Sequence, residues 1–131
     1  MSHILLIIDD DRTIQKLHSM LVKKNEFAEE FLIFENGQLA LDFLLKFDKN
    51  QTVIILLDIN MPIMNGWEFL DAVNQSLFGY SIFVAIVSSS VDLDDLEKAK
   101  SYPQVMAYID KPLSYNALQL LKTNIQIAHL F

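Results

Sequence analysis

The chain has 131 residues, of which 52% are hydrophobic and 21% charged, and it contains no cysteine. This length fits one domain with its own core over residues 1–131, the composition excludes an intrinsically disordered chain, and the lack of cysteine excludes disulfides and thiolate zinc sites. The net charge of −7 provides little basic surface, so direct binding to nucleic acid is not expected.

The first apolar run, residues 4–8, is short and continuous, which is typical of a strand buried on both faces. It follows no basic segment and ends in three aspartates, so it does not resemble a signal peptide. No stretch approaches the roughly 18 apolar residues of a membrane span. We therefore expect a soluble, cytoplasmic protein with no membrane partner.

Apolar runs and helical spacings alternate along the rest of the chain. Further strands are predicted over residues 31–34, 53–57, 82–87 and 105–109. Helices are predicted over 13–24, from Asn36-Gly37 to Phe47, from Trp67 to Leu77, over 92–100, and from a Ser114 cap to Ile125. This alternation predicts an α/β fold with helices on both faces of a parallel sheet, and right-handed crossovers narrow it to a doubly wound sheet.

Polar side chains follow four of the predicted strands. They are Asp9, Asp10 and Asp11 after the first strand, Asp58 and Asn60 after the third, Ser88, Ser89 and Ser90 after the fourth, and Asp110 and Lys111 after the fifth. Ligands of open α/β sheets bind beyond the carboxyl ends of the strands. The sequence therefore predicts that these groups converge on one edge of the sheet.

Three of these acids, Asp9, Asp10 and Asp58, are candidate ligands for a cation. Clustered carboxylates raise one another's pKa unless a cation neutralises them, and oxygen ligands suit Mg²⁺, with the backbone carbonyl of Asn60 as a further candidate. Consecutive aspartates are also typical of a helix N-terminus, where acids favour the helix dipole. Asp11 is expected to cap the first helix, and both interpretations of the acids stay open at this point.

Lys111 and Ser88 can each be read in two ways. Lys111 is either a solvated loop residue or a cation that pairs with Asp58 and later with a phosphoryl oxygen. Ser88 is either a loop hydroxyl or a donor to a group carried by Asp58. Taken with the acids, these side chains favour phosphoryl transfer onto Asp58, which would form an aspartyl phosphate.

The sequence segments around these four strand ends, taken in order, resemble those of the receiver domain of bacterial two-component response regulators, and the resemblance covers essentially the whole chain. The residues that carry the resemblance are 8–11, 57–66, 87–90 and 108–112. The resemblance implies a flavodoxin-like (βα)5 fold whose five-stranded parallel sheet has the order 2-1-3-4-5. It also implies that the chain is not an enzyme beyond Mg²⁺-dependent self-phosphorylation and self-dephosphorylation.

The resemblance also implies the roles of single residues. Asp58 would be the phosphoacceptor, Asp9, Asp10 and the Asn60 carbonyl would hold Mg²⁺ beside Asp58, and Lys111 would contact the acyl phosphate. Ser88 and Tyr108 would form the switch, in which the tyrosine ring turns inward when the hydroxyl moves. The partners implied are a sensor histidine kinase or phosphotransfer protein and a downstream protein target.

Histidine spacing agrees with an external donor, since His3, His18 and His129 are scattered and none is expected at the strand-end edge. Two enzyme alternatives are disfavoured. A flavodoxin-like FMN binder needs a glycine- and hydroxyl-rich loop where the chain has three aspartates, and a haloacid-dehalogenase-like phosphatase needs a general acid where the chain has Asn60. A stand-alone receiver, a receiver excised from a larger regulator or hybrid kinase, and a pseudo-receiver scaffold stay open, and the Met1 start and short tail favour the first.

Overall fold

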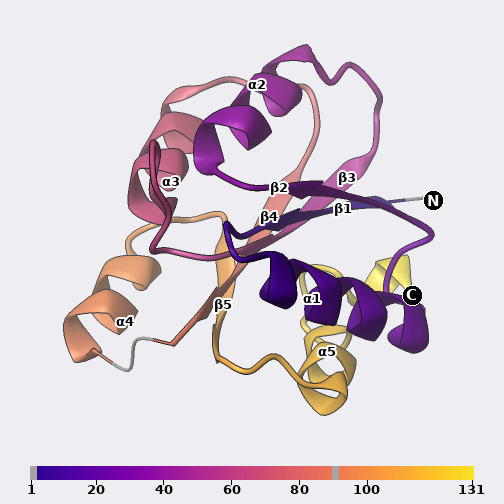
Figure 1. Cartoon of the computed structure of the whole chain (residues 1–131). Coiled ribbons are helices and arrows are strands. Elements are labelled where there is room, and N and C mark those ends of the chain that lie inside the picture. Colours follow the sequence, from indigo (N-terminus) through magenta and orange to yellow (C-terminus); the bar gives the residue numbers. More distant parts are fainter. Residues whose placement is uncertain (1–2, 90–91) are drawn as a thin grey trace.

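The structure, a computed structural model, describes residues 3–89 and 92–131 (Figure 1). Its elements are β1 (His3–Ile8), α1 (Arg12–Asn25), β2 (Glu30–Phe34), α2 (Gly37–Lys46), β3 (Thr52–Leu57), α3 (Gly66–Gln75), β4 (Ile82–Ser88), α4 (Leu93–Lys100), β5 (Val105–Asp110), α5 (Tyr115–Leu121) and a 3-10 turn, η1 (Ala128–Leu130). All strands pair in parallel in the order β2-β1-β3-β4-β5, which confirms the predicted fold and strand order.

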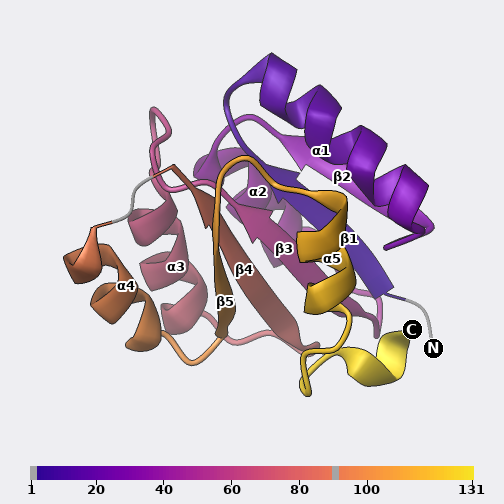
Figure 2. The same cartoon turned by 90° about the horizontal axis from the view of Figure 1, so that it is seen from below.

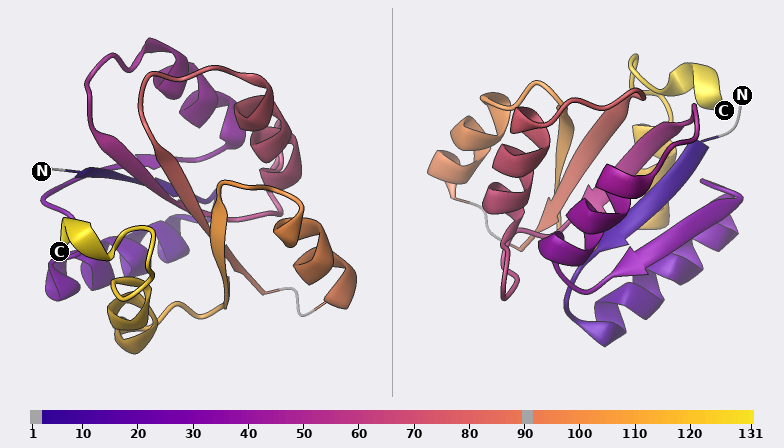
Figure 3. Two further views of the ribbon diagram at one scale, coloured as in Figure 1. Left: turned by 180° about the vertical axis from the view of Figure 1, so that it is seen from behind. Right: turned by 90° about the horizontal axis from the view of Figure 1, so that it is seen from above.

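The helices form a layer on each face of the sheet. Helices α1 and α5 pack on one face, where Val22 and Leu118 join a cluster with the strand residues Leu5 and Ile54 (Figure 2). Helices α2 and α3 cover the other face, and α4 adds Ala99 to the same cluster (Figure 3, right). Residues that alternate along each strand enter opposite clusters, which is why the central strands read as unbroken apolar runs.

The centre of the sheet is far more buried than its ends. Every residue of β3 is buried, whereas no residue of β5 is. Strands β2 and β5 each pair with a single neighbour and form the two edges. The polar residues that follow β1 and β3 therefore stand on the most enclosed part of the fold.

Side-chain caps begin the helices where the sequence changes from strand to helix. The carboxylate of Asp11 accepts from the backbone N–H groups of Thr13 at 2.8 Å and Ile14 at 3.3 Å, so the predicted cap is confirmed. Asn65 and Glu68 form a reciprocal capping box at the start of α3. These caps fix the loops that carry the polar residues at the carboxyl edge.

Two predicted helix ends are wrong. Helix α3 ends at Gln75, and Leu77 lies beyond it, fully exposed. Helix α5 ends at Leu121, and Ile125, predicted on its apolar face, is 92% exposed. In the second case the chain leaves the helical path before Asn124, whose side-chain amide donates to the Met106 carbonyl of β5 at 3.3 Å.

An aromatic stack joins α3 to the end of α4. The ring of Trp67 lies on Tyr102, with 6.0 Å between centroids, and the Lys98 ammonium lies 4.8 Å from the centroid of the Trp67 ring. The Tyr102 hydroxyl donates to Asp71 at 2.6 Å. Burial, with a smaller contribution from Asp71, raises the pKa of Tyr102 to about 12.

None of the described helices combines the length and apolar character that crossing a membrane requires.

Candidate functional site

Strands β1 and β3 bring two buried carboxylates together at the carboxyl edge of the sheet. The backbone N–H of Asp58 donates to the Ile8 carbonyl at 2.9 Å, so Asp58 follows β3 directly beside Asp9. Asp9 is 1% exposed and Asp58 7% exposed. The neighbouring Asp10 is exposed, and one carboxylate oxygen from each of the three residues lies within 4.8 Å of the others. The predicted convergence of these acids is therefore present in the structure.

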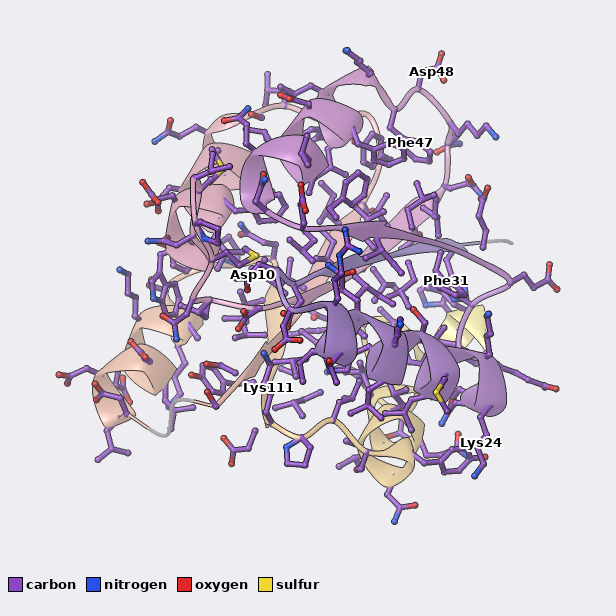
Figure 4. The ribbon with its side chains drawn as sticks, in the orientation of Figure 1. Asp10, Lys24, Phe31, Phe47, Asp48 and Lys111 are labelled. Carbon is purple, nitrogen blue, oxygen red and sulfur yellow. The ribbon has the colours of Figure 1, made fainter. Side chains whose placement is uncertain are left out.

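Lys111, which directly follows β5, reaches this pair, and Figure 4 shows it on the same side of the molecule as Asp10. Its Nζ lies 2.9 Å from Oδ2 of Asp9 and 3.3 Å from Oδ1 of Asp58. Its backbone N–H donates to the Ser88 carbonyl at 2.9 Å, and the peptide bond to Pro112 is cis. The ammonium therefore bridges both buried carboxylates, and its shorter contact is to Asp9 rather than to the predicted Asp58.

Burial and neighbouring charges act in opposite directions on these groups. Burial, and then the negative charge of Asp9, raise the pKa of Asp58, while Lys111 lowers it by a smaller amount. Burial by itself would lower the pKa of Lys111, but its contacts with Asp9 and Asp58 together outweigh that effect and raise it. The site thus keeps its lysine charged and holds an aspartate that resists ionisation.

The loop between β3 and α3 folds tightly over Asp58. The N–H of Gly66 donates to the Ile59 carbonyl at 2.8 Å. A Cβ at Gly66 would lie 2.7 Å from the Asp58 carbonyl oxygen, a distance that no side chain tolerates, so this position requires glycine. Ile63 takes the left-handed conformation with φ 69° and is 79% exposed. Asn60, whose carbonyl was a predicted metal ligand, lies exposed in this loop.

The predicted switch residues, Ser88 and Tyr108, lie on β4 and on the neighbouring edge strand β5. Ser88 ends β4, is fully buried, and lies opposite Asp110 in the register of the sheet. Tyr108 is half-buried on β5, opposite Ile86. Ser89 is exposed, and Ser90 lies outside the described residues. Ser88 and Tyr108 therefore lie on adjacent strands, two register steps apart.

His18 lies closer to this site than its place in the sequence predicts. It is 2% exposed on α1, and burial lowers its pKa, with opposing contributions from the charges of Asp9 and Lys111. Within the described part of the chain neither ring nitrogen has a hydrogen-bond partner. The available signal was spacing, because position 18 is four residues from both Ile14 and Val22 and so lies on the buried face of α1.

Comparison with known proteins agrees with this architecture. Residues 5–122 match the family model of the response regulator receiver domain. The crystal structure of a two component response regulator from Cytophaga hutchinsonii is 31% identical, covers 98% of each chain, and superposes with a TM-score of 0.82.

The alignments with two curated relatives cover different shares of this chain and of each relative. The probable methanogenesis regulatory protein FilR2 of Methanothrix harundinacea (strain 6Ac) is 28% identical over 119 residues, which are 88% of this chain and 76% of that protein. The protein-glutamate methylesterase/protein-glutamine glutaminase 3 of Burkholderia thailandensis is 38% identical over 68 residues, 52% of this chain and 18% of that longer protein. The receiver-domain model matches residues 5–122, which are most of this chain, and this match shows that the chain belongs to the response regulator receiver domain family.

Proposed function

We propose that the chain accepts a phosphoryl group on Asp58 and thereby changes a protein-binding surface. The observation that supports this most directly is the bridging of Asp9 and Asp58 by Lys111, at 2.9 and 3.3 Å, beside the exposed carboxylate of Asp10. One carboxylate is thus held next to a cation and to further acids. Phosphoryl transfer to a carboxylate needs this kind of arrangement, because charge on the phosphoryl oxygens must be offset.

The acids also fit a divalent metal ion. Three carboxylate oxygens within 4.8 Å of one another, two of them from buried residues, are hard ligands of the type that Mg²⁺ prefers. Asp9, Asp10, Asp58 and the backbone carbonyl of Asn60 would hold the ion. When bound, Mg²⁺ supplies positive charge that offsets the phosphoryl oxygens and the crowded carboxylates.

The protein's own groups have separate tasks in this reaction. A carboxylate oxygen of Asp58 forms the new bond to phosphorus while the bond from phosphorus to its donor breaks. Lys111 favours the ionised form of Asp58 before transfer and can donate to a phosphoryl oxygen afterwards. Asp9 keeps the ammonium in place through its 2.9 Å contact. The donor is a sensor histidine kinase or a phosphotransfer protein.

The switch would follow from this chemistry. The acyl phosphate on Asp58 brings added negative charge and acceptor oxygens to the carboxyl end of β3, and β4, the next strand of the sheet, ends at Ser88. Ser88 would move to donate to one of these oxygens, and Tyr108 on the adjacent strand would turn inward. The surface of α4, β5 and α5 would then change shape for a downstream protein target. The cytoplasmic location and the lack of further enzymatic activity stay predictions.

Phosphate incorporation tests the proposal. Incubation with radiolabelled acetyl phosphate and Mg²⁺ should label the wild-type protein with an acid-stable, base-labile phosphate. The variant Asp58→Asn should incorporate none, because its amide is not a nucleophile, while its far-UV circular dichroism stays unchanged. EDTA should also stop the labelling of the wild type.

The matched control is Asp48→Asn, which makes the same change on an exposed loop far from the site (Figure 4). This variant should be labelled like the wild type. Full labelling of Asp58→Asn would show that another residue is the acceptor. A folded wild type that is never labelled, by acetyl phosphate or by a phosphorylated histidine donor, would favour the pseudo-receiver alternative.

A further inference from the structure

We propose that the open edge of β2, together with α1, binds an extended segment of a partner protein in which acidic and apolar residues alternate. The surface is a groove of about 740 Å³ between α1, β2 and the start of α2. It lies on a different side of the molecule from the α4–β5–α5 surface and does not depend on the proposed phosphorylation.

The groove is lined by three exposed, large apolar side chains. Met20 of α1 is 67% exposed, Ile33 of β2 is 42% exposed and Leu39 of α2 is 44% exposed, and all three line the groove. Exposed apolar side chains that cluster on a protein surface indicate a binding site for another molecule, because binding removes them from water.

The backbone of β2 offers hydrogen bonds at the same place. The Phe34 carbonyl accepts from the N–H of Asp9 at 3.0 Å, so the polar groups of Phe34 point toward β1. Because these groups alternate along a strand, those of Ile33 point toward the other edge. Strand β2 pairs with β1 alone in the described sheet, so this outer edge can accept one more strand.

The charge of the groove selects the chemistry of that strand. Three basic residues of α1, Arg12, Lys16 and Lys23, line it, with Glu35 as the single acid, in a chain whose net charge is −7. From Arg12 to Lys23 the helix rises about 16 Å, which is the length of about five residues of a strand. An added strand can therefore set acidic side chains toward α1 and apolar ones toward Leu39.

The position of α1 favours a peptide over a second folded copy. In Figure 2 and in the right panel of Figure 3, α1 runs alongside β2 and projects past this edge of the sheet. A single extended segment fits beneath such a helix. Two copies that paired β2 with β2 would bring their α1 helices to the same face and into collision, since adjacent strands lie only about 4.8 Å apart.

Titration of the unphosphorylated, ¹⁵N-labelled protein with synthetic peptides tests the proposal. The probe is an acetylated peptide of about six residues that alternates glutamate and valine. We expect saturable shifts of backbone amide resonances centred on Ile33, weaker at high salt. Replacing its glutamates by lysine, or methylating alternate amide nitrogens, should weaken binding about tenfold or more, because the first reverses the charge and the second removes donors to β2.

Protein variants give the matched comparison. The double variant Lys16→Glu, Lys23→Glu should bind the probe about tenfold more weakly, whereas Lys98→Glu, Lys100→Glu on the opposite side should bind it like the wild type. Equal binding of the lysine peptide, or shifts centred outside β2 and α1, would overturn the proposal. So would a dimer in sedimentation equilibrium that Ile33→Lys dissociates, because the occupant would then be a second copy.

Discussion

Strands β3 and β5 both deliver a residue to the same site, yet their surroundings differ sharply. All six residues of β3 are buried between β1 and β4. Strand β5 lies at the edge, its residues are half-buried or exposed, and its pairing with β4 shifts register between Val84 and Ala85. Asp58 therefore follows the most enclosed strand, whereas Tyr108 lies on an edge strand and Lys111 follows that strand.

This difference assigns different physical properties to chemistry and to signalling. A reacting carboxylate gains from a rigid strand, because its position beside Asp9 must hold. A switch needs an element with few buried contacts, since such elements rearrange at low cost in free energy. The comparison predicts that truncating an apolar side chain of β3 lowers the free energy of unfolding strongly and that truncating one of β5 lowers it weakly.

Truncation of one apolar side chain on each strand should give the largest contrast. Ile55→Ala on β3 removes fully buried methyl and methylene groups and should lower the free energy of unfolding by about 2–5 kcal/mol. Val105→Ala on β5 removes half-buried methyls and should cost about 1 kcal/mol. Urea denaturation of both variants measures the difference, and equal losses would contradict the contrast between the strands.

Replacing the bridging lysine should give the next largest effect. Lys111→Met keeps much of the side-chain volume but leaves the carboxylates of Asp9 and Asp58 without their cation. We therefore expect the free energy of unfolding to fall by about 1–3 kcal/mol. Lys100→Met breaks an exposed ion pair with Glu97, at 3.3 Å, and should change stability little. If the two variants unfold at the same urea concentration, the bridge at the site contributes nothing to the fold.

The raised pKa of Asp58 predicts that Asp58→Asn stabilises the protein at neutral pH. The folded state binds the Asp58 proton more tightly than the unfolded chain does. The free energy of unfolding therefore falls as pH rises from the ordinary value of 3.8 through the raised pKa. The variant removes this loss, so its advantage in EDTA should be present at pH 7 and shrink on acidification to below 3.8.

Mg²⁺ should reverse that advantage, because a bound ligand stabilises the folded state by mass action and the wild type retains the full set of carboxylates. Thermal unfolding of both proteins with Mg²⁺ and with EDTA gives the comparison. A variant that is less stable than the wild type in EDTA at neutral pH would show that the contact with Lys111 outweighs burial and the charge of Asp9.

The smallest expected effect concerns the loop after β3. Ile63 is a β-branched residue with a φ of 69°, a conformation that costs L-residues free energy and that glycine adopts freely. Ile63→Gly should therefore raise the free energy of unfolding by up to about 1 kcal/mol. Ile125→Gly, at another exposed site without positive φ, should not stabilise. Equal effects in the two variants would contradict strain at position 63.

Sequence patterns predicted most of this fold because its evidence is local. Continuous apolar runs marked the strands within a residue of their ends, and the aspartates after β1 and β3 marked the edge where the acids meet. Long-range contacts are what local spacing does not reveal. Beyond the end of α5 at Leu121, the side chain of Asn124 donates to the Met106 carbonyl, 18 residues away. Spacing along α1 indicates that His18 is buried, but it cannot reveal that the ring lies near the charges of Asp9 and Lys111.

The stack of Trp67, Tyr102 and Lys98 has a practical consequence. Trp67 is the single tryptophan of the chain, and its partners belong to α4 and the residues that follow it. Its emission is therefore a built-in optical reporter of the spacing between α3 and α4. Motion of α4 can be followed in stopped-flow mixing without attaching a dye to the molecule.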